Sequence, residues 1–134
     1  MSRKNIVRRS AGLVIGLFPV LLLVASIAAG FSGLQLRVPG GLGFMVAASI
    51  VAVMNFYLSF VRGRIYLIRH GSREGYRHVS GLPLIGTALV VLGVLLGFGD
   101  IGGALLGMAV MLVDTGGSVW FLFSTWRDGS FWDS

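Results

Sequence analysis

The chain has 134 residues, of which 55% are hydrophobic and only 12% are charged. Soluble domains carry about 25% charged residues, and so short a chain could not bury this much apolar surface in a core of its own. The high hydrophobicity also excludes disorder. There is no cysteine, which excludes a disulfide framework, a thiolate nucleophile and a cysteine metal site. The composition therefore indicates an integral membrane protein.

Long stretches without a charged residue predict an all-α membrane protein, a four-transmembrane-helix bundle formed by residues 1–134 as one domain. A helix needs about 20 apolar residues to cross a hydrocarbon core about 30 Å thick. Three uncharged stretches meet this requirement, and a fourth is interrupted only by Asp114. The predicted spans are 11–31, 42–61, 82–98 and 103–126, with a basic loop at 62–80.

The first span follows a basic head that contains Arg3, Lys4, Arg8 and Arg9. Pro19 lies inside this span, and we expect it to kink the helix because proline removes a backbone N–H donor. The head is also typical of a cleavable signal peptide. The apolar run is longer than a usual signal sequence, which favours a retained span, but both alternatives stay open.

The basic residues predict the orientation of the four spans. Ten of the eleven lie in the head, in the middle loop or after the last span, and Arg37 alone lies in the turn between the first two spans. Positively charged loops stay in the cytoplasm, so we expect the N-terminus, the C-terminus and the basic loop there. The loop is expected to attract anionic lipid rather than nucleic acid, at about 1 kcal/mol per basic residue. Its basic residues are Arg62, Arg64, Arg69, Arg73 and Arg77.

Glycine is abundant, with 21 residues, and several glycines recur at a spacing of four. Such pairs put small residues on one helix face, where helices in lipid can approach each other closely. The pairs predict packing within the bundle or, alternatively, a groove for a partner or for a second copy of the chain. They are Gly12 with Gly16, Gly93 with Gly97, and Gly103 with Gly107.

Residues near the ends of the predicted spans are typical of helix starts and of membrane interfaces. Ser80 can cap the third helix, and Pro83 lies in its first turn, where a missing N–H costs no hydrogen bond. Aromatic side chains anchor proteins at membrane interfaces. We expect Tyr66, Trp126 and Trp132 to be anchors at the inner interface.

Asp114 lies in the middle of the predicted fourth span. An ionised carboxylate there costs about 2.5–3.5 kcal/mol, so we expect Asp114 to be neutral or hydrogen-bonded inside the bundle. Asn55 lies at a similar depth, within about one helical turn, and is the expected partner, with contributions from Thr115 and Ser118. The acid is either a structural clamp or a functional group that carries a proton, holds a substrate or contacts a partner helix.

Two short motifs match those of aspartic proteases, Asp114-Thr115-Gly116 and Gly97-Phe98-Gly99-Asp100. That chemistry requires two carboxylates that share a proton, and Asp100 is predicted in the outer turn, about 16 Å from Asp114 along a helix. His70 and His78 lack a carboxylate cluster and make a poor metal site. We therefore predict no catalysis, no metal and no cofactor.

Residues 77–117 carry a family resemblance. Ser80-Gly81-Leu82-Pro83-Leu84-Ile85-Gly86 follows a basic loop and precedes a helix, a turn and a second helix with Asp114-Thr115-Gly116. This pattern resembles that of small multi-span bacterial inner-membrane proteins associated with polymorphic-toxin (immunity) loci. It departs from the pattern at Thr87, where a second glycine is usual, and in the outer turn, which lacks the usual Pro and Trp. The resemblance implies an inner-membrane protein that binds a toxin, with Pro83, Gly86 and Asp114 as framework or recognition residues.

Three functions are compatible with these features. The first is a non-catalytic immunity protein that neutralises a membrane-acting toxin by helix–helix contact, as the resemblance implies. The second is an accessory or structural subunit of a larger bacterial membrane complex. The glycine faces and the aromatic residues near the C-terminus are equally compatible with this function. The third is a small proton-coupled transporter that uses Asp114, with dimerisation through Gly103 and Gly107 bringing two acids together.

Overall fold

The computed structural model describes residues 3–36, 38–77, 79, 81–126, 128 and 132. Within these residues every regular element is helical, which confirms the predicted all-α class. Arg37, His78 and Ser80 lie outside the described residues. The elements are α1 (Arg3–Phe31), α2 (Gly41–Phe56), the π-helical turn η1 (Tyr57–Val61), α3 (Arg62–His70), α4 (Ile85–Leu96), α5 (Ile101–Val113) and α6 (Ser118–Thr125).

Three stretches of the described helices are long and apolar enough to cross a membrane: Ile6–Phe31, Gly41–His70 and Ile101–Thr125. The helix in the predicted third span is shorter than expected, since α4 has 12 residues and is about 18 Å long. The predicted basic loop is also partly helical, because α2 continues through η1 into α3. The predicted fourth span is not one helix, because the chain turns between α5 and α6.

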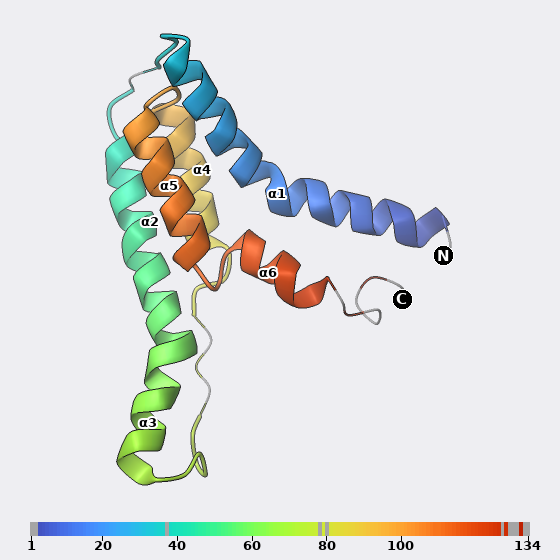
Figure 1. Ribbon diagram of the computed structural model, residues 1–134, viewed down its shortest axis with the longest axis vertical. Helices are drawn as coiled ribbons and strands as arrows, with labels where there is room; N and C mark the ends of the chain where they lie inside the picture. The colour runs from blue at the N-terminus through green and yellow to red at the C-terminus, as the bar shows by residue number, and fades with distance from the viewer. Residues whose placement is uncertain are drawn as a thin grey trace.

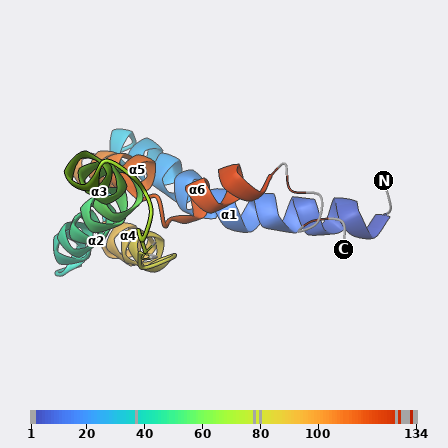
Figure 2. The ribbon, with the colours of Figure 1, turned by 90° about the horizontal axis from the view of Figure 1, so that it is seen from below.

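The molecule consists of a bundle and a lateral arm (Figure 1). The bundle contains α2, α4, α5 and the C-terminal part of α1 (residues 19–31). The arm contains the N-terminal part of α1 (residues 3–18) and α6, which lie side by side and extend away from the bundle (Figure 2). α1 bends near its middle (Figure 1), and Pro19 is the proline inside this helix. The bend agrees with the kink expected from a proline that cannot donate a backbone hydrogen bond.

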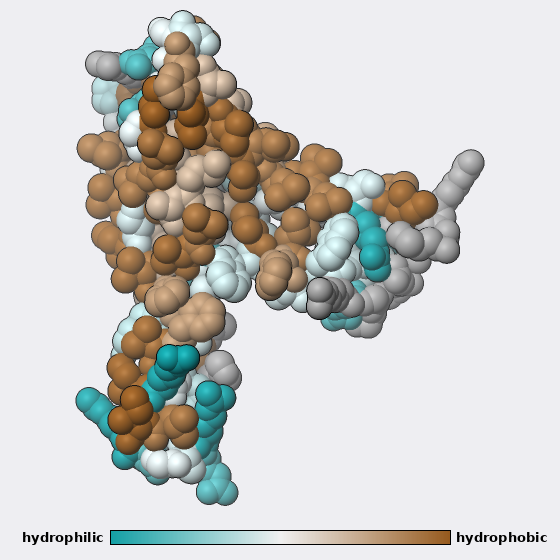
Figure 3. All heavy atoms as spheres, in the orientation of Figure 1, coloured by the Kyte–Doolittle hydropathy of each residue, from teal (hydrophilic) through white to brown (hydrophobic). Residues whose placement is uncertain are grey.

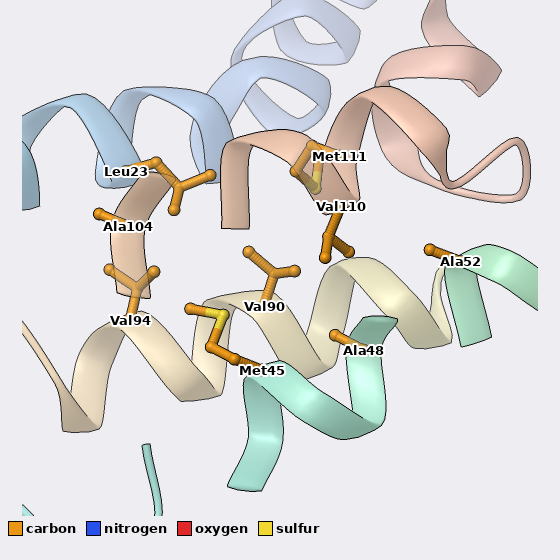
Figure 4. Packing of buried hydrophobic residues seen from close by; sticks show 9 residues of the cluster. All are labelled: Leu23, Met45, Ala48, Ala52, Val90, Val94, Ala104, Val110 and Met111. Atoms are coloured by element: carbon orange, nitrogen blue, oxygen red, sulfur yellow. The ribbon is translucent and has the colours of Figure 1, made fainter. Parts of the chain in front are cut away.

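The bundle core is built from aliphatic and small side chains of all its helices (Figure 4). Gly107 of α5 faces Leu23, Met45 and Val90, and a Cβ atom at this position would lie 2.6 Å from a methyl group of Leu23. A larger residue would therefore push α1 and α5 apart. The buried hydrophobic residues are Leu23, Met45, Ala48, Ala52, Val90, Val94, Ala104, Val110 and Met111.

The other predicted glycine faces are also used inside the chain. Gly93 lies against Met45 and the backbone of Gly41, so that α2 and α4 approach closely. Gly12 and Gly16 of the arm lie under Trp132 and Leu122. These contacts favour the interpretation of the glycine pairs as packing within the chain rather than as a groove for a partner. Gly97 and Gly103 instead lie beside Asp100 at the end of the bundle.

The exposed surface of the bundle and of much of the arm is apolar (Figure 3). Large side chains that would be buried in a soluble domain are exposed, among them Ile15 (72%), Leu42 (69%) and Leu112 (69%). Hydrophilic residues gather at the α3 end and toward the free end of the arm (Figure 3). This distribution is typical of a protein whose apolar surface faces lipid.

Candidate functional site

The centre of the site is the break between α5 and α6. α5 ends at Val113, and Asp114 Oδ1 accepts a hydrogen bond of 3.2 Å from the backbone N–H of Gly116. The carbonyl of Asp114 also accepts a hydrogen bond of 2.9 Å from the N–H of Gly117. An aspartate that bonds the backbone two residues ahead stabilises a turn in competition with a helix. The Asp-Thr-Gly-Gly sequence therefore ends the helix at the position where the sequence predicts the middle of a span.

Asn55 of α2 connects this turn to the segment before α4. Its Nδ2 atom donates to Asp114 Oδ1 over 2.6 Å and to the carbonyl of Leu82 over 3.1 Å. Its Oδ1 atom accepts from the N–H of Leu82 over 2.8 Å. The hydrogen bond predicted between Asn55 and Asp114 is therefore present. One carboxamide joins α2, the segment at Leu82 and the α5–α6 turn.

Further hydrogen bonds fix the start of α6. The backbone N–H of Ser118 donates to Thr87 Oγ1 of α4 over 3.0 Å, and Ser118 Oγ donates to the carbonyl of Gly16 over 3.0 Å. The carbonyl of Gly16 lies three residues before Pro19, in the part of α1 that forms the arm. α6 is thereby attached both to the bundle and to α1. We call these interacting residues, Asn55, Leu82, Thr87, Asp114 and Ser118, the polar knot.

The segment that resembles the immunity-associated pattern packs directly onto the turn. A Cβ atom at Gly86 would overlap Asp114 Oδ2, so this glycine lets α4 pass close to the carboxylate. The N–H of Leu84 donates to the carbonyl of Gly116 over 2.8 Å. Leu84 has φ of 61°, a left-handed conformation that costs a leucine roughly 1–2 kcal/mol. Pro83 lines a small cavity beside Asn55.

The polar side chains of the knot are closed to solvent. Asp114 is 0% exposed and Asn55 is 1% exposed. Asp114 Oδ2 has no hydrogen-bond partner among the described residues, and it is enclosed by the neighbouring glycines Gly86 and Gly117. Buried acids in a membrane are costly unless they are paired. Asp114 Oδ1 therefore joins the α5–α6 turn to Asn55 of α2, and Asn55 in turn binds the segment at Leu82.

The structure places the other predicted polar residues apart from the carboxylate. Thr115 Oγ1 lies 2.8 Å from Ser59 Oγ of η1, on the exposed side of the turn. Asp100 caps the opposite end of α5, where its Oδ1 accepts from the N–H of Gly102 over 3.1 Å. Because α5 separates the two carboxylates by about 20 Å, Asp100 and Asp114 cannot share a proton within one chain. Within the described part of the chain, no three potential metal-ligating side chains gather.

The predicted interface anchors have different surroundings. Tyr66 Oη donates to the carbonyl of Glu74 over 2.9 Å, and its ring stacks on His70 at 4.2 Å. Trp126 lies under the guanidinium of Arg9, at 5.9 Å. Trp132 is only 5% exposed, and its Nε1 donates to the carbonyl of Thr125 over 2.7 Å. Trp132 therefore packs inside the arm and is not placed as an exposed anchor.

Sequence reasoning missed two buried polar residues, Thr87 at the site and Ser26 at the opposite end of α5. Thr87 marks a departure from the family pattern, and the structure gives it a role as acceptor for the first N–H of α6. Ser26 is 0% exposed, and its Oγ accepts from the N–H of Gly99 over 2.9 Å. Each side chain accepts a hydrogen bond from a backbone N–H in a turn, where backbone donors lack helical partners. Only the packed structure shows which turn each residue contacts.

An open apolar groove of about 550 Å³ runs along the arm, beside the polar knot. Its lining comes from α1 and α6, together with Leu84 and Trp132. Ile15 lies on this lining and is 72% exposed. The groove therefore offers apolar surface where the chain itself leaves the arm uncovered.

Comparison with protein families, with curated proteins and with solved structures finds no match to this chain.

Proposed function

We propose that this chain is a non-catalytic protein of the bacterial inner membrane that binds a transmembrane helix of another protein along its arm. The partner proposed is a membrane-acting toxin, which makes the chain an immunity protein. The observation that carries the proposal is the break at Asp114. Residues 101–125 are apolar enough to cross a membrane, yet the chain redirects α6 sideways. Broken helices persist in membranes only where protein contacts satisfy the freed backbone groups, and the polar knot supplies these contacts.

The dimensions support an arm that lies in the plane of the inner leaflet. α5 has 13 residues and is about 20 Å long, and a helix with its side chains is about 10 Å thick. A bundle of this length with one layer of arm beneath it measures about 30 Å, which is the thickness of the hydrocarbon core. An arm in the cytoplasmic leaflet would also bring the basic head and the α3 hairpin to the same side, as the positive-inside rule requires.

The arm suits contact with a helix because its own glycines are already covered and much of its remaining surface is apolar. Val14, Ile15 and Phe18 are 66%, 72% and 50% exposed, and Phe121 and Phe123 of α6 are 48% and 78% exposed. Phenylalanine is among the residues enriched in the cores of protein interfaces. A toxin helix held along the arm could not join other helices to form a pore, and this is how binding would neutralise it.

The burial of Asp114 and of Gly107 supports the transporter alternative less well. Gly107, through which two acids would approach each other, lies inside the bundle against Leu23 and Met45. A dimer through Gly103 and Gly107 would require the bundle to open. An accessory subunit of a membrane complex could use the same arm as an immunity protein, so the identity of the bound protein distinguishes these two functions.

The test is purification of the tagged full-length chain from its own membranes in mild detergent, followed by mass spectrometry of the retained proteins. The variant Ile15→Trp fills the groove, and Leu42→Trp is the matched control on a similarly exposed residue outside the groove lining. We expect one membrane protein to be retained stoichiometrically by the wild type and by Leu42→Trp, and lost with Ile15→Trp. Retention of the same proteins by all three chains, or of none, would contradict binding at the arm.

The retained partner is then expressed in cells with and without the chain. An immunity protein should restore viability, Leu42→Trp should protect equally, and Ile15→Trp should not. A partner that is harmless alone and belongs to a stable membrane assembly would refute the toxin and favour the accessory subunit.

A further inference from the structure

A second cavity, of about 490 Å³, lies at the α3 end of the molecule, away from the groove. It forms between the helix that runs from η1 into α3 and the chain that returns from Gly71 toward α4. Its lining is Ser59, Phe60, Gly63, Arg64, Arg73 and Tyr76. The cavity therefore combines arginines and hydroxyl groups with one exposed aromatic ring.

The two arginines come from opposite sides of this cavity. Arg64 lies in α3, and Arg73 lies in the returning segment, two residues beyond the turn at Gly71. Among the described residues no carboxylate forms an ion pair with either guanidinium, although Glu74 is adjacent to Arg73 in the sequence. Two unneutralised positive charges thus line one cavity.

The returning segment is held against α3, so the cavity is formed before any ligand binds. The ring of Tyr76 packs over Gly63, where a Cβ atom would lie 3.6 Å from the tyrosine Oη. The Arg62 guanidinium lies 5.9 Å from the same ring, and Tyr66 contacts it at 5.1 Å. Tyr66 also donates to the carbonyl of Glu74. A preformed site loses less entropy on binding than a flexible one.

The geometry points to a binding site for the phosphate group of an anionic phospholipid. Arginine recognises phosphate through paired, charge-assisted hydrogen bonds, and Arg64 and Arg73 both line this cavity. Phe60, which is 45% exposed, gives the cavity an apolar wall for the glycerol and upper acyl chain. The choice of a lipid over free phosphate rests on the membrane orientation proposed above, which places the α3 end at the cytoplasmic interface.

The test measures how many phosphatidylglycerol molecules stay bound to the full-length chain in detergent, by native mass spectrometry during lipid titration. The variant pair is Arg64→Ala with Arg73→Ala. The matched control is Arg69→Ala with Arg77→Ala, which removes the same charge from the same hairpin but leaves the cavity lining intact. Each charge-assisted hydrogen bond contributes roughly tenfold in affinity. We therefore expect the Arg64→Ala and Arg73→Ala pair to weaken retention of phosphatidylglycerol about 100-fold, and the control pair to weaken it less than about threefold.

Phosphatidylcholine and inorganic phosphate are the comparison ligands. We expect the wild-type chain to retain phosphatidylglycerol at least tenfold better than phosphatidylcholine, and 10 mM inorganic phosphate not to displace it. Equal losses in the two variant pairs, or no preference for the anionic lipid, would overturn the site. Binding of inorganic phosphate without lipid, abolished in the cavity pair, would overturn the lipid as the source of the phosphate. Circular dichroism and gel filtration show whether each variant folds as the wild type does.

Discussion

Replacement of Asn55 by alanine should cost about 2–5 kcal/mol in the free energy of unfolding. The side chain is 1% exposed and makes three hydrogen bonds, two to the backbone of Leu82 and one to Asp114. Interhelical hydrogen bonds inside membrane proteins contribute about 0.6–1.7 kcal/mol each, which gives the stated range for three. The turn at Asp114 and the entry to α4 should both loosen.

The assay is reversible unfolding of the full chain in mixed micelles, followed by tryptophan fluorescence while a denaturing detergent is added. Ser49→Ala is the control, because among the described residues Ser49 bonds only to the carbonyl of Met45 on its own helix. It should cost less than about 0.5 kcal/mol. A double-mutant cycle with Asp114→Ala should show a coupling of about 1–2 kcal/mol. Additive single effects, or equal costs for Asn55→Ala and Ser49→Ala, would refute the polar knot as the element that holds the break.

Three further variants test the packing around the break and the arm. Gly86→Ala should destabilise the chain by about 1–3 kcal/mol in the same unfolding assay, since its Cβ would overlap the Asp114 carboxylate. Gly43→Ala is the control, because Gly43 lies in a helix and faces open space, and this change should be neutral or stabilising. Equal effects of Gly86→Ala and Gly43→Ala would contradict the close contact between Gly86 and Asp114. Leu84→Gly should stabilise the fold by up to about 1 kcal/mol, because glycine adopts the left-handed conformation of residue 84 without the steric cost that leucine has. The control Leu82→Gly should not stabilise the fold. A loss of stability in Leu84→Gly would argue against the left-handed conformation. Trp132→Ala should accelerate hydrogen exchange of the amides in α6 and in residues 6–18 by roughly tenfold or more while the bundle stays protected, because this tryptophan covers Gly12. Phe123→Ala, at a residue of α6 that is 78% exposed, is its control. Unchanged exchange in the Trp132 variant would show that the arm is held by other contacts.

The sequence predicted those features that depend on composition and on one helical repeat. The apolar stretches locate the helices, Pro19 marks the bend of α1, and similar depth in the membrane pairs Asn55 with Asp114. Each of these predictions needs only the rise of a helix and the cost of burying a polar group in lipid.

The break in the fourth span could not be predicted in the same way. Mean hydropathy is averaged over many residues, so residues 101–125 still have the hydropathy of a membrane span even though they contain Asp114, Thr115 and two glycines. Whether Asp-Thr-Gly-Gly continues a helix or ends it depends on partners that are distant in the sequence. Here Thr87 accepts the N–H of Ser118, and the carbonyl of Gly16 accepts its hydroxyl. The burial of Trp132 was missed for a related reason, because it depends on how the tail packs against α1 and α6.

The measurement that most directly tests this account is the depth of two positions of α1 in a bilayer. Val7 and Phe18 are both exposed, at 67% and 50%, and lie 11 residues, or about 16 Å, apart on one face of the helix. The chain has no cysteine, so single cysteines at these positions can carry spin labels for depth measurement by power-saturation EPR. Leu42 and Val53 of α2, which have the same spacing and are 69% and 64% exposed, are the control pair.

An arm that lies in the plane of the inner leaflet predicts depths that agree within about 5 Å for positions 7 and 18, while positions 42 and 53 differ by about 16 Å. A difference of about 16 Å at both pairs would mean that α1 crosses the membrane along its whole length. That result would contradict the lateral arm and, with it, the surface on which the proposed partner binds.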